Sequence, residues 1–398
     1  MTGVGLLDRV HGEDANGGGH QRRRSRRGVR HGEQPEERAC PDAASCRAKF
    51  ECGIKSKILP DTAVARVARG ELPQMTGTWN HAKKWHDRHP LEEVASPMPA
   101  KRDISDDPSS AALRPCTAPL GPWAGYTFAA RPVFAATSAY QCIEVVDLPA
   151  FGALGRAYRL DGRFMASLAD AHICHECMVH PLLLAHGNAQ RVLVLGGGDG
   201  GSAREALRHP SVREVVVAEL DAQVPAAILK YMPTLADGAF DDPRTTLVIG
   251  DARDFVDAAL ARGEAFDAVI FDLTDADGEA ATLHGAPFFA KLRALLGPRG
   301  AIALQLGAPW FEADQVARML DALRSVFKFV QPMATYVPLY GTLWALAFAS
   351  DSLDVRGSDA TAATQALLSR ESLRHYSPAR RAALFDIPPE LMDVFGDR

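Results

Sequence analysis

Long apolar runs and a disulfide framework are both missing from this chain of 398 residues. No stretch approaches the roughly 18 uninterrupted apolar residues of a membrane-spanning helix, which argues against a membrane-embedded protein. Seven cysteines, an odd number scattered between positions 40 and 177, do not form the framework of a small secreted protein. Hydrophobic residues make up 47% and charged residues 23% of the chain, ordinary values for a soluble globular protein.

A recognisable export signal is also missing. The arginine-rich run RRRSRR at positions 22–27 is followed by polar residues. A Sec or twin-arginine signal requires an apolar segment of about 7–15 residues at that point. We therefore expect a cytoplasmic protein.

The chain contains one segment that resembles half of a zinc-binding motif. The segment HICHEC at positions 172–177 has no second cysteine or histidine pair downstream at the usual spacing. His175 and His180 stand five residues apart, not the four that would place both imidazoles on one face of a helix. We expect no metal, and the alternative for His175 is a buried structural histidine.

Charge is distributed unevenly along the chain. Residues 1–60 hold 12 Lys and Arg against 8 Asp and Glu, whereas the remaining residues hold 32 against 41. An acidic body argues against nucleic acid as the main partner and is compatible with a cationic substrate. Residues 1–135 show no periodicity, and we interpret them as a low-order extension, or as sequence upstream of the natural start, rather than as a basic arm.

Regular patterns begin near residue 138. Short strands at Ile143–Asp147 and Ala157–Leu160 predict a small β-domain over residues 136–186, closed by a helix from about residue 175 to 185. Over residues 187–350, apolar strands alternate with helices, which predicts a doubly wound, Rossmann-like α/β domain of the methyltransferase type. Its strands are expected at Val192–Leu195, Val215–Ala218, Thr246–Ile249, Ala268–Phe271 and Ala301–Leu306. Residues 351–398 would form a C-terminal tail.

Candidate binding residues directly follow these strands, where ligands lie in such sheets. The loop GGGDGG after the first strand has the G-x-G-x-x-G pattern of a tight turn that a ligand can approach closely, with glycines at Gly196, Gly198 and Gly201. Acidic residues follow four successive strands: Asp199, Glu219, Asp251 and Asp272. Helix capping would explain Asp251 equally well, but four acids at four strand ends predict a binding site.

The charge of the loop indicates the kind of ligand. Asp199 would repel a pyrophosphate but suits a cationic nucleoside, which favours an adenosyl-sulfonium ligand over NAD. Asp272 and Asp275 lie three residues apart, and with Asp199 and Glu176 they could line a negative pocket for a polyamine. Such a pocket raises the pKa of the amine, so a carboxylate must assist removal of its proton.

These motifs together resemble those of the polyamine aminopropyltransferases, the spermidine synthases and their relatives, over about residues 138–351. The resemblance rests on GGGDGGSAREALRHPSV at 196–212, followed by Glu219-Leu220-Asp221, and on the upstream pairs Tyr140-Gln141 and His175-Glu176. The loop DLTD at 272–275 and the segment Tyr336-Val337-Pro338 are more similar to thermospermine synthases and their bacterial relatives.

The resemblance implies a function and a role for each matching residue. The enzyme would move the aminopropyl group of decarboxylated S-adenosylmethionine, a co-substrate and not a cofactor, to a polyamine such as putrescine or spermidine. It would also be a homodimer. Donor contacts are implied for Gln141, Gly196, Gly198, Asp199, Gly201, Glu219, Asp251 and Ala252. Acceptor contacts are implied for His175, Asp275 and Tyr336, and proton removal for Asp272.

Several positions depart from the family pattern. Met165 stands where glutamine is usual, and Cys174 stands where tyrosine is usual. They motivate one alternative, a catalytically weak ligand-binding homologue. The other alternative is an S-adenosylmethionine-dependent methyltransferase, although Asp199 is a poor neighbour for the carboxylate of that donor. The identity of the acceptor depends on distant side chains and is not predicted.

Overall fold

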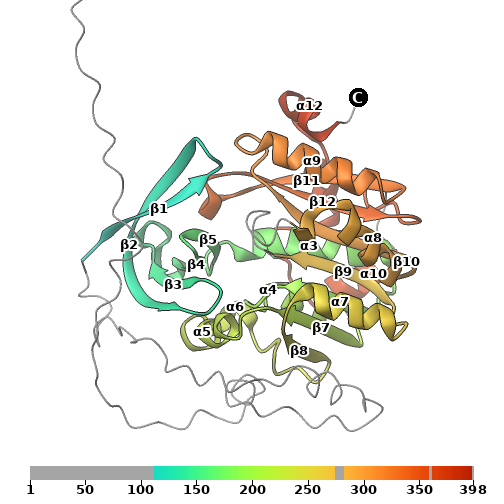
Figure 1. The fold of residues 1–398 in the computed structure, drawn as a ribbon, viewed down its shortest axis with the longest axis horizontal. Coiled ribbons are helices and arrows are strands. Elements are labelled where there is room, and N and C mark those ends of the chain that lie inside the picture. The colour runs from blue at the N-terminus through green and yellow to red at the C-terminus, as the bar shows by residue number, and fades with distance from the viewer. Residues whose placement is uncertain (1–111, 274–281, 358–360, 397–398) are drawn as a thin grey trace, which may run out of the picture. The chain divides into compact units, whose positions relative to one another are not determined.

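The computed structural model describes residues 112–273, 282–357 and 361–396. Most of the expected N-terminal extension and the predicted site residue Asp275 lie outside the described residues. Within these ranges, no helix combines the length and the apolar character needed to cross a membrane. The described chain contains a five-stranded sheet followed by a seven-stranded sheet (Figure 1).

The five-stranded sheet is antiparallel, with the strand order β1-β2-β3-β4-β5. Its strands are β1 (Arg114–Leu120), β2 (Ala124–Thr137), β3 (Cys142–Asp147), β4 (Arg156–Leu160) and β5 (Arg163–Ser167). A short 3₁₀ helix, η3 (Pro149–Leu154), joins β3 to β4. Strands β3 and β4 each begin one residue before the predicted position, but the sheet that contains them begins at Arg114 of β1 and not near residue 136.

Strands β1 and β2 contradict the prediction that residues up to 135 lack regular structure. Strand β1 alternates between buried and exposed positions, but the residues that it buries are small, Cys116 and Ala118. It also contains Pro115 and Pro119, which a sheet tolerates at an edge, and β1 is an edge strand. The β-branched and aromatic alternation by which strands are predicted is therefore missing from β1.

The seven-stranded sheet has the order β11-β12-β10-β9-β6-β7-β8. Its strands are β6 (Arg191–Gly196), β7 (Glu214–Glu219), β8 (Thr245–Ile249), β9 (Phe266–Asp272), β10 (Leu296–Gly307), β11 (Phe329–Val337) and β12 (Thr342–Ser350). Strands β8, β7, β6, β9 and β10 pair in parallel, whereas β12 is antiparallel to both β10 and β11. The Rossmann-like α/β prediction is confirmed, with an antiparallel strand that makes the sheet mixed.

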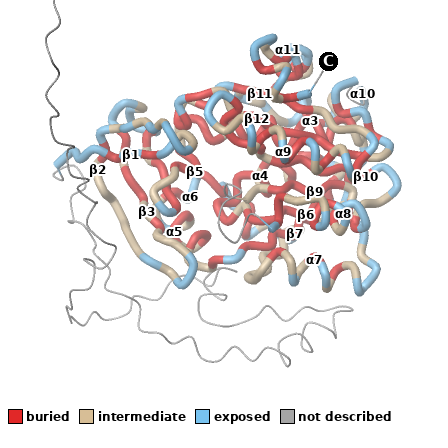
Figure 2. Tube along the Cα trace, turned by 45° about the horizontal axis from the view of Figure 1, so that its top comes forward, coloured by how far each residue is buried: buried red, intermediate tan, exposed pale blue. Residues whose placement is uncertain are grey.

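Helices cover both faces of this sheet. They are α3 (Ala171–His186), α4 (Gly201–Leu207), α5 (Gln223–Tyr231), α6 (Pro233–Ala236), α7 (Ala252–Ala261), α8 (Ala286–Leu295) and α9 (Ala313–Arg324). In β6, Val192 and Val194 pack with residues of α3 and α4, whereas Leu193 and Leu195 pack with residues of α7, α8 and α9. All four side chains are fully buried, because alternate residues of a parallel strand face opposite helical layers. In Figure 2 the strands at the centre of this sheet are coloured mostly as buried.

The C-terminal segment packs on the same two cores. It contains α10 (Thr361–Leu368), α11 (Pro378–Leu384), the 3₁₀ helix η6 (Pro389–Leu391) and α12 (Met392–Phe395). Tyr376 joins the core around α3, and Phe395 joins the core around α9. The described part of the tail is therefore an integral part of the folded body.

Candidate active site

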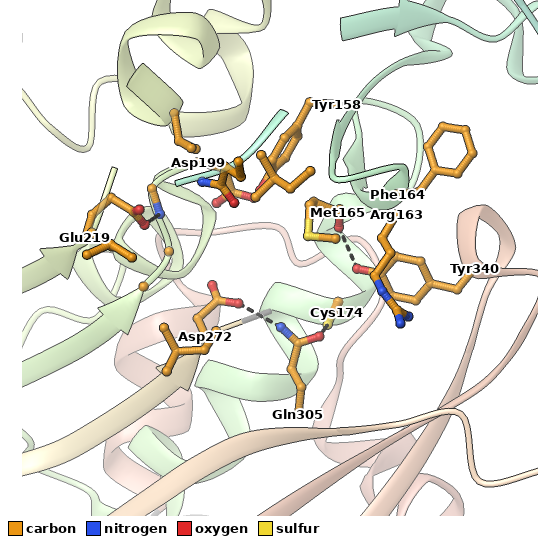
Figure 3. A pocket seen from close by; sticks show the side chains of 18 of the residues that line it. Tyr158, Arg163, Phe164, Met165, Cys174, Asp199, Glu219, Asp272, Gln305 and Tyr340 are labelled. Carbon is orange, nitrogen blue, oxygen red and sulfur yellow. Dashed lines mark hydrogen bonds between the residues drawn. The ribbon is translucent and has the colours of Figure 1, made fainter. Parts of the chain in front are cut away.

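A cavity of about 270 Å³ lies at the carboxyl ends of the parallel strands. Asp199, Glu219, Asp251 and Asp272, the acids at the ends of β6, β7, β8 and β9, all line it. Figure 3 shows Asp199, Glu219 and Asp272 around one shared space. The four acids that the sequence singles out therefore belong to one site.

The glycine loop between β6 and α4 leaves no room for side chains, and two of its positions show why this matters for the site. A Cβ atom on Gly198 would lie 2.7 Å from Oε2 of Glu219, and one on Gly201 would lie 2.1 Å from Cε1 of His175. Gly196 and Gly198 line the cavity, whereas Gly201 packs against the imidazole of His175. The glycines thus allow Glu219 and His175 to approach the loop backbone closely.

Glu219 is held by two backbone amides. The N–H of Gly198 donates to Oε2 at 3.0 Å, and the N–H of Asp221 donates to Oε1 at 2.8 Å. Burial nevertheless raises the pKa of Glu219 to about 7, with a contribution from the nearby charge of Asp221. Gln141, also on the cavity wall, donates to Oδ2 of Asp221 at 3.1 Å, so β2–β3 and β7 are linked at this point.

Asp199 and His175 form a buried pair. Nε2 of His175 lies 3.5 Å from Oδ2 of Asp199, which also accepts from the hydroxyl of Tyr158 at 3.1 Å. Burial favours the neutral imidazole, but the charge of Asp199 outweighs it and raises the pKa of His175. Burial likewise opposes the charge of Asp199, but His175 and the amide of Gly201 lower the pKa of its carboxyl. Each group therefore favours the charged form of the other.

Asp272 completes a cluster that could hold a cation. Ligand atoms of His175, Asp199 and Asp272 all lie within 4.8 Å of one another. Burial raises the pKa of Asp272, and the charge of Asp199 adds to the increase while His175 opposes it. Its carboxylate accepts hydrogen bonds from the side chains of Ser202 and Gln305. The same arrangement suits an ammonium group, which two carboxylates can bind.

Asp251 has both of the roles that the sequence leaves open. It caps α7 by accepting from the N–H of Arg253 at 2.7 Å, and it lines the cavity together with Ala252. Hydrogen bonds from the Arg253 guanidinium hold the pKa of Asp251 below its usual range. A capping residue at this strand end thus still presents a carboxylate to the cavity.

Two residues that the sequence places at the site do not reach it. Tyr336 lies on the edge strand β11, is 57% exposed, and is not part of the cavity wall. Glu176 is fully buried behind the cavity, where its carboxylate accepts from the backbone N–H groups of Arg374, His375 and Tyr376. Glu176 therefore anchors the C-terminal segment and does not add negative charge to the cavity wall.

The second wall of the cavity has a different character. It is formed by the tip of β1, by β2, β5, η5 (Pro338–Tyr340) and β12, and beside Arg163 of β5 it presents mainly apolar and aromatic groups. The aromatic side chains among its residues are Tyr126, Phe164, Tyr340 and Trp344. A chain of methylene groups would contact this wall favourably, while its ammonium groups face the acids opposite.

The polar residues of the cavity that sequence reasoning missed include Tyr158, Gln305 and Tyr340. Gln305 and Tyr158 lie inside strands, where a polar residue gives no local signal of a site. Tyr340 follows Pro338 on η5, and its hydroxyl donates to the carbonyl of Met165 at 2.6 Å. The signal that favoured Tyr336 lay in the same short segment, but the turn of η5 brings Tyr340 to the cavity instead.

Comparison with known proteins agrees with this geometry. The family model of the spermine/spermidine synthase domain matches residues 171–356. A polyamine aminopropyltransferase of Nitrosomonas europaea is 40% identical over 293 residues, which cover 73% of this chain and 88% of that protein. One of Korarchaeum cryptofilum is 37% identical and covers 64% of this chain and 78% of that protein.

Solved structures show the same likeness. A spermidine synthase in complex with the transition-state analogue AdoDATO is 26% identical, with a TM-score of 0.64 over 69% of this chain and 92% of that chain. The spermidine synthase of Thermotoga maritima is 25% identical, with a TM-score of 0.66 over 74% of this chain and 98% of that chain. With strand-end acids around one cavity and relatives aligned over most of their length, the chain belongs to the polyamine aminopropyltransferase family, and it is an aminopropyltransferase.

Proposed function

We propose that the enzyme uses decarboxylated S-adenosylmethionine as donor and a polyamine of the putrescine or spermidine class as acceptor. The observation that carries this proposal is the buried cluster of His175, Asp199 and Asp272 inside a cavity that also contains Glu219. Two carboxylates at the centre of the cavity favour ligands that bring positive charge. Both proposed substrates do so, one through a sulfonium and an ammonium, the other through ammonium groups.

The donor would lie along the seven-stranded sheet. Glu219 would accept hydrogen bonds from the ribose hydroxyls, and Asp251 with Ala252 would contact the adenine edge. Gln141 and the glycine loop, Gly196, Gly198 and Gly201, would shape the nucleoside pocket. Asp199 would bind the ammonium of the aminopropyl group. S-adenosylmethionine carries a carboxylate beside this ammonium, and Asp199 would repel that carboxylate.

The acceptor would lie between the acids and the aromatic wall. We propose that His175 and Asp275 orient the acceptor amine and that Tyr340 contributes in place of Tyr336. Because Asp199 would pair with the ammonium of the donor, Asp272 is the carboxylate left beside the reacting nitrogen.

The reaction is an in-line displacement. The lone pair of the acceptor nitrogen forms a bond to the methylene carbon next to the sulfonium. The carbon–sulfur bond breaks, and its electron pair stays on sulfur, so methylthioadenosine leaves as a neutral molecule. Asp272 takes the proton from the nitrogen. The enzyme therefore contributes alignment and deprotonation, and it has no oxyanion to stabilise.

The methyltransferase alternative is not favoured, because the matching relatives are aminopropyltransferases and Asp199 opposes the carboxylate of S-adenosylmethionine. Calorimetry with S-adenosylmethionine and its decarboxylated form tests this point. We expect clear binding of the decarboxylated form and at least tenfold weaker binding of the other. Equal affinities would contradict the proposed role of Asp199.

Product analysis tests the function itself. Purified enzyme receives decarboxylated S-adenosylmethionine with putrescine, cadaverine, agmatine and spermidine together, and mass spectrometry identifies the products. We expect methylthioadenosine in equal amount to one aminopropylated amine. Binding of methylthioadenosine without any transfer would favour the ligand-binding homologue. Light scattering on the same sample tests the proposed homodimer.

A further inference from the structure

Both carboxylate oxygens of Asp272 are engaged by side chains from different elements. Nε2 of Gln305, on β10, donates to Oδ1 at 2.8 Å, and the hydroxyl of Ser202, on α4, donates to Oδ2 at 2.7 Å. Ser202 is fully buried, and Gln305 lies on the cavity wall. Neither residue belongs to the glycine pattern or to the strand-end acids that define the site.

The amide of Gln305 has only one orientation that fits its neighbours. Nε1 of Trp344, on β12, donates to Oε1 of Gln305 at 2.9 Å, and an indole nitrogen can only donate. The thiol of Cys174, on α3, lies 3.8 Å from the same oxygen and is a weak donor. Oε1 therefore faces two donors, which turns the NH₂ group of Gln305 toward Asp272 (Figure 3).

Hydrogen bonds in this set consequently run in one direction. Trp344 donates to Gln305, Gln305 donates to Asp272, and Ser202 donates to the other oxygen of Asp272. An ionised carboxylate accepts from all of its neighbours, whereas a protonated one must donate once. The Gln305 amide, oriented by Trp344, cannot accept that proton.

We propose that Trp344, Gln305 and Ser202 are positioning residues that keep Asp272 ionised and fixed in direction while it awaits the proton of the acceptor amine. This inference rests on the proposed function, in which Asp272 is the proton acceptor. The three residues act through Asp272 and need not touch the reacting atoms. Hydrogen bonds to the charged form of a group stabilise that form.

The other groups that face Asp272 define what these donors must offset. Asp199, on the glycine loop, repels a second negative charge, and burial has the same effect. His175, on α3, favours the charged form, while Cys174 on α3, Tyr158 on β4 and Tyr340 on η5 face it as neutral groups with raised pKa values. Only the imidazolium of His175 and the donors from Ser202 and Gln305 oppose the protonation of Asp272 among these groups.

The decisive variant is Trp344→Phe, which keeps an aromatic ring but removes the N–H. Gln305 can then turn its oxygen toward Asp272, and two acceptors in contact favour a protonated carboxyl. Ser202→Ala removes the second donor from the other side of Asp272. For each variant we expect the acid limb of the kcat/KM–pH profile to move to higher pH by about one unit. The readout is the position of the acid limb and not the level of activity, because Trp344 also belongs to the aromatic wall and Trp344→Phe changes that wall at every pH.

Ser167→Ala is the matched control. Ser167 is a buried serine whose hydroxyl donates to a buried carboxylate, that of Asp170, at 2.6 Å, but neither residue lines the cavity. Its acid limb should not move. A variant with a damaged fold would have a lower kcat/KM at every pH. A displaced acid limb therefore distinguishes the loss of a positioning residue from a damaged fold.

A second measurement does not need turnover. With ¹³Cγ-labelled aspartate and Asp272→Asn to identify the signal, NMR gives the titration midpoint of Asp272 in the parent enzyme, Trp344→Phe and Ser202→Ala. We expect the midpoint to rise by about one pH unit in both variants. An unchanged midpoint in both would overturn the inference. If the parent enzyme transfers no aminopropyl group, the proposed function fails, while the NMR titration still decides the positioning role.

Discussion

The two walls of the cavity are built on different principles. The wall formed by the seven-stranded sheet carries acids whose oxygens accept from backbone amides or neighbouring side chains, as Glu219 and Asp199 do. The wall formed by the five-stranded sheet, η5 and Trp344 of β12 carries aromatic rings and apolar strand residues. The first wall can bind charge in a fixed geometry, whereas the second offers a surface along which a flexible chain can lie.

This difference explains why one wall is visible in the sequence and the other is not. The acids and glycines of the first wall follow strands within a few residues, and each parallel strand brings its end to the same edge of the sheet. The aromatic residues of the second wall come from segments as far apart as Tyr126 and Trp344. These residues lie together only because the two sheets pack against each other, and no short sequence pattern predicts that packing.

Of the effects predicted from the comparison of the two walls, the largest is expected for Asp272, the proposed proton acceptor. Asp272→Asn should lower kcat by on the order of 10³-fold, because the acceptor nitrogen then loses its proton acceptor. Affinity for methylthioadenosine, measured by calorimetry, should change little, because Asn keeps the size of the side chain. Turnover at the level of the parent enzyme would remove Asp272 from its proposed role.

The next effect concerns the stability of the acidic wall. The pKa of Glu219 is about 7 in the folded, ligand-free enzyme against 4.5 for an ordinary glutamate, so the folded state binds more protons between these values. The stabilising contribution is therefore complete below pH 4.5 and is lost as the pH rises through 7, by roughly 3 kcal/mol in total. Between pH 5 and pH 8, the free energy of unfolding measured with denaturant should decrease less for Glu219→Gln than for the parent enzyme. Equal decreases would contradict the buried, protonated state of Glu219.

A third prediction separates charge from shape on the same wall. Asp199→Asn should weaken binding of decarboxylated S-adenosylmethionine by about ten- to a hundredfold, because a buried carboxylate that pairs with an ammonium is lost. Methylthioadenosine lacks that ammonium and serves as the matched ligand, so its dissociation constant should change by less. Equal losses for the two ligands would mean that Asp199 supports the fold of the loop and not the charge of the donor.

The smallest effect is expected on the aromatic wall. Tyr340→Phe should raise the KM for the acceptor a few-fold, because it removes a hydroxyl that donates to the Met165 carbonyl and holds η5 against β5. Tyr336→Phe, on the exposed edge strand, should change neither KM nor kcat. Steady-state kinetics on the pair tests the assignment, and an effect of Tyr336→Phe larger than that of Tyr340→Phe would reverse it.

Much of the fold and about half of the site follow from short-range patterns. Strand β6, strand β7 and the glycine loop form within one or two residues of their predicted bounds. Their apolar runs and turn residues act over fewer than ten positions, a range within which sequence spacing and structure correspond directly. Strand β1 escaped prediction because its buried residues are small and prolines interrupt it.

Sequence alone determined that acids would stand at the ends of parallel strands around a glycine loop, because strand direction and chain order bring those ends together. Tertiary structure alone decided which groups form hydrogen bonds with the acids of this region. Gln305 donates to Asp272 from 33 residues away, Trp344 donates to Gln305 from 39 residues further along the chain, and Glu176 turns its carboxylate to amides near residue 375. Such partners are selected by the packing of helices and strands, because a hydrogen bond depends on distance in space and not on separation along the chain.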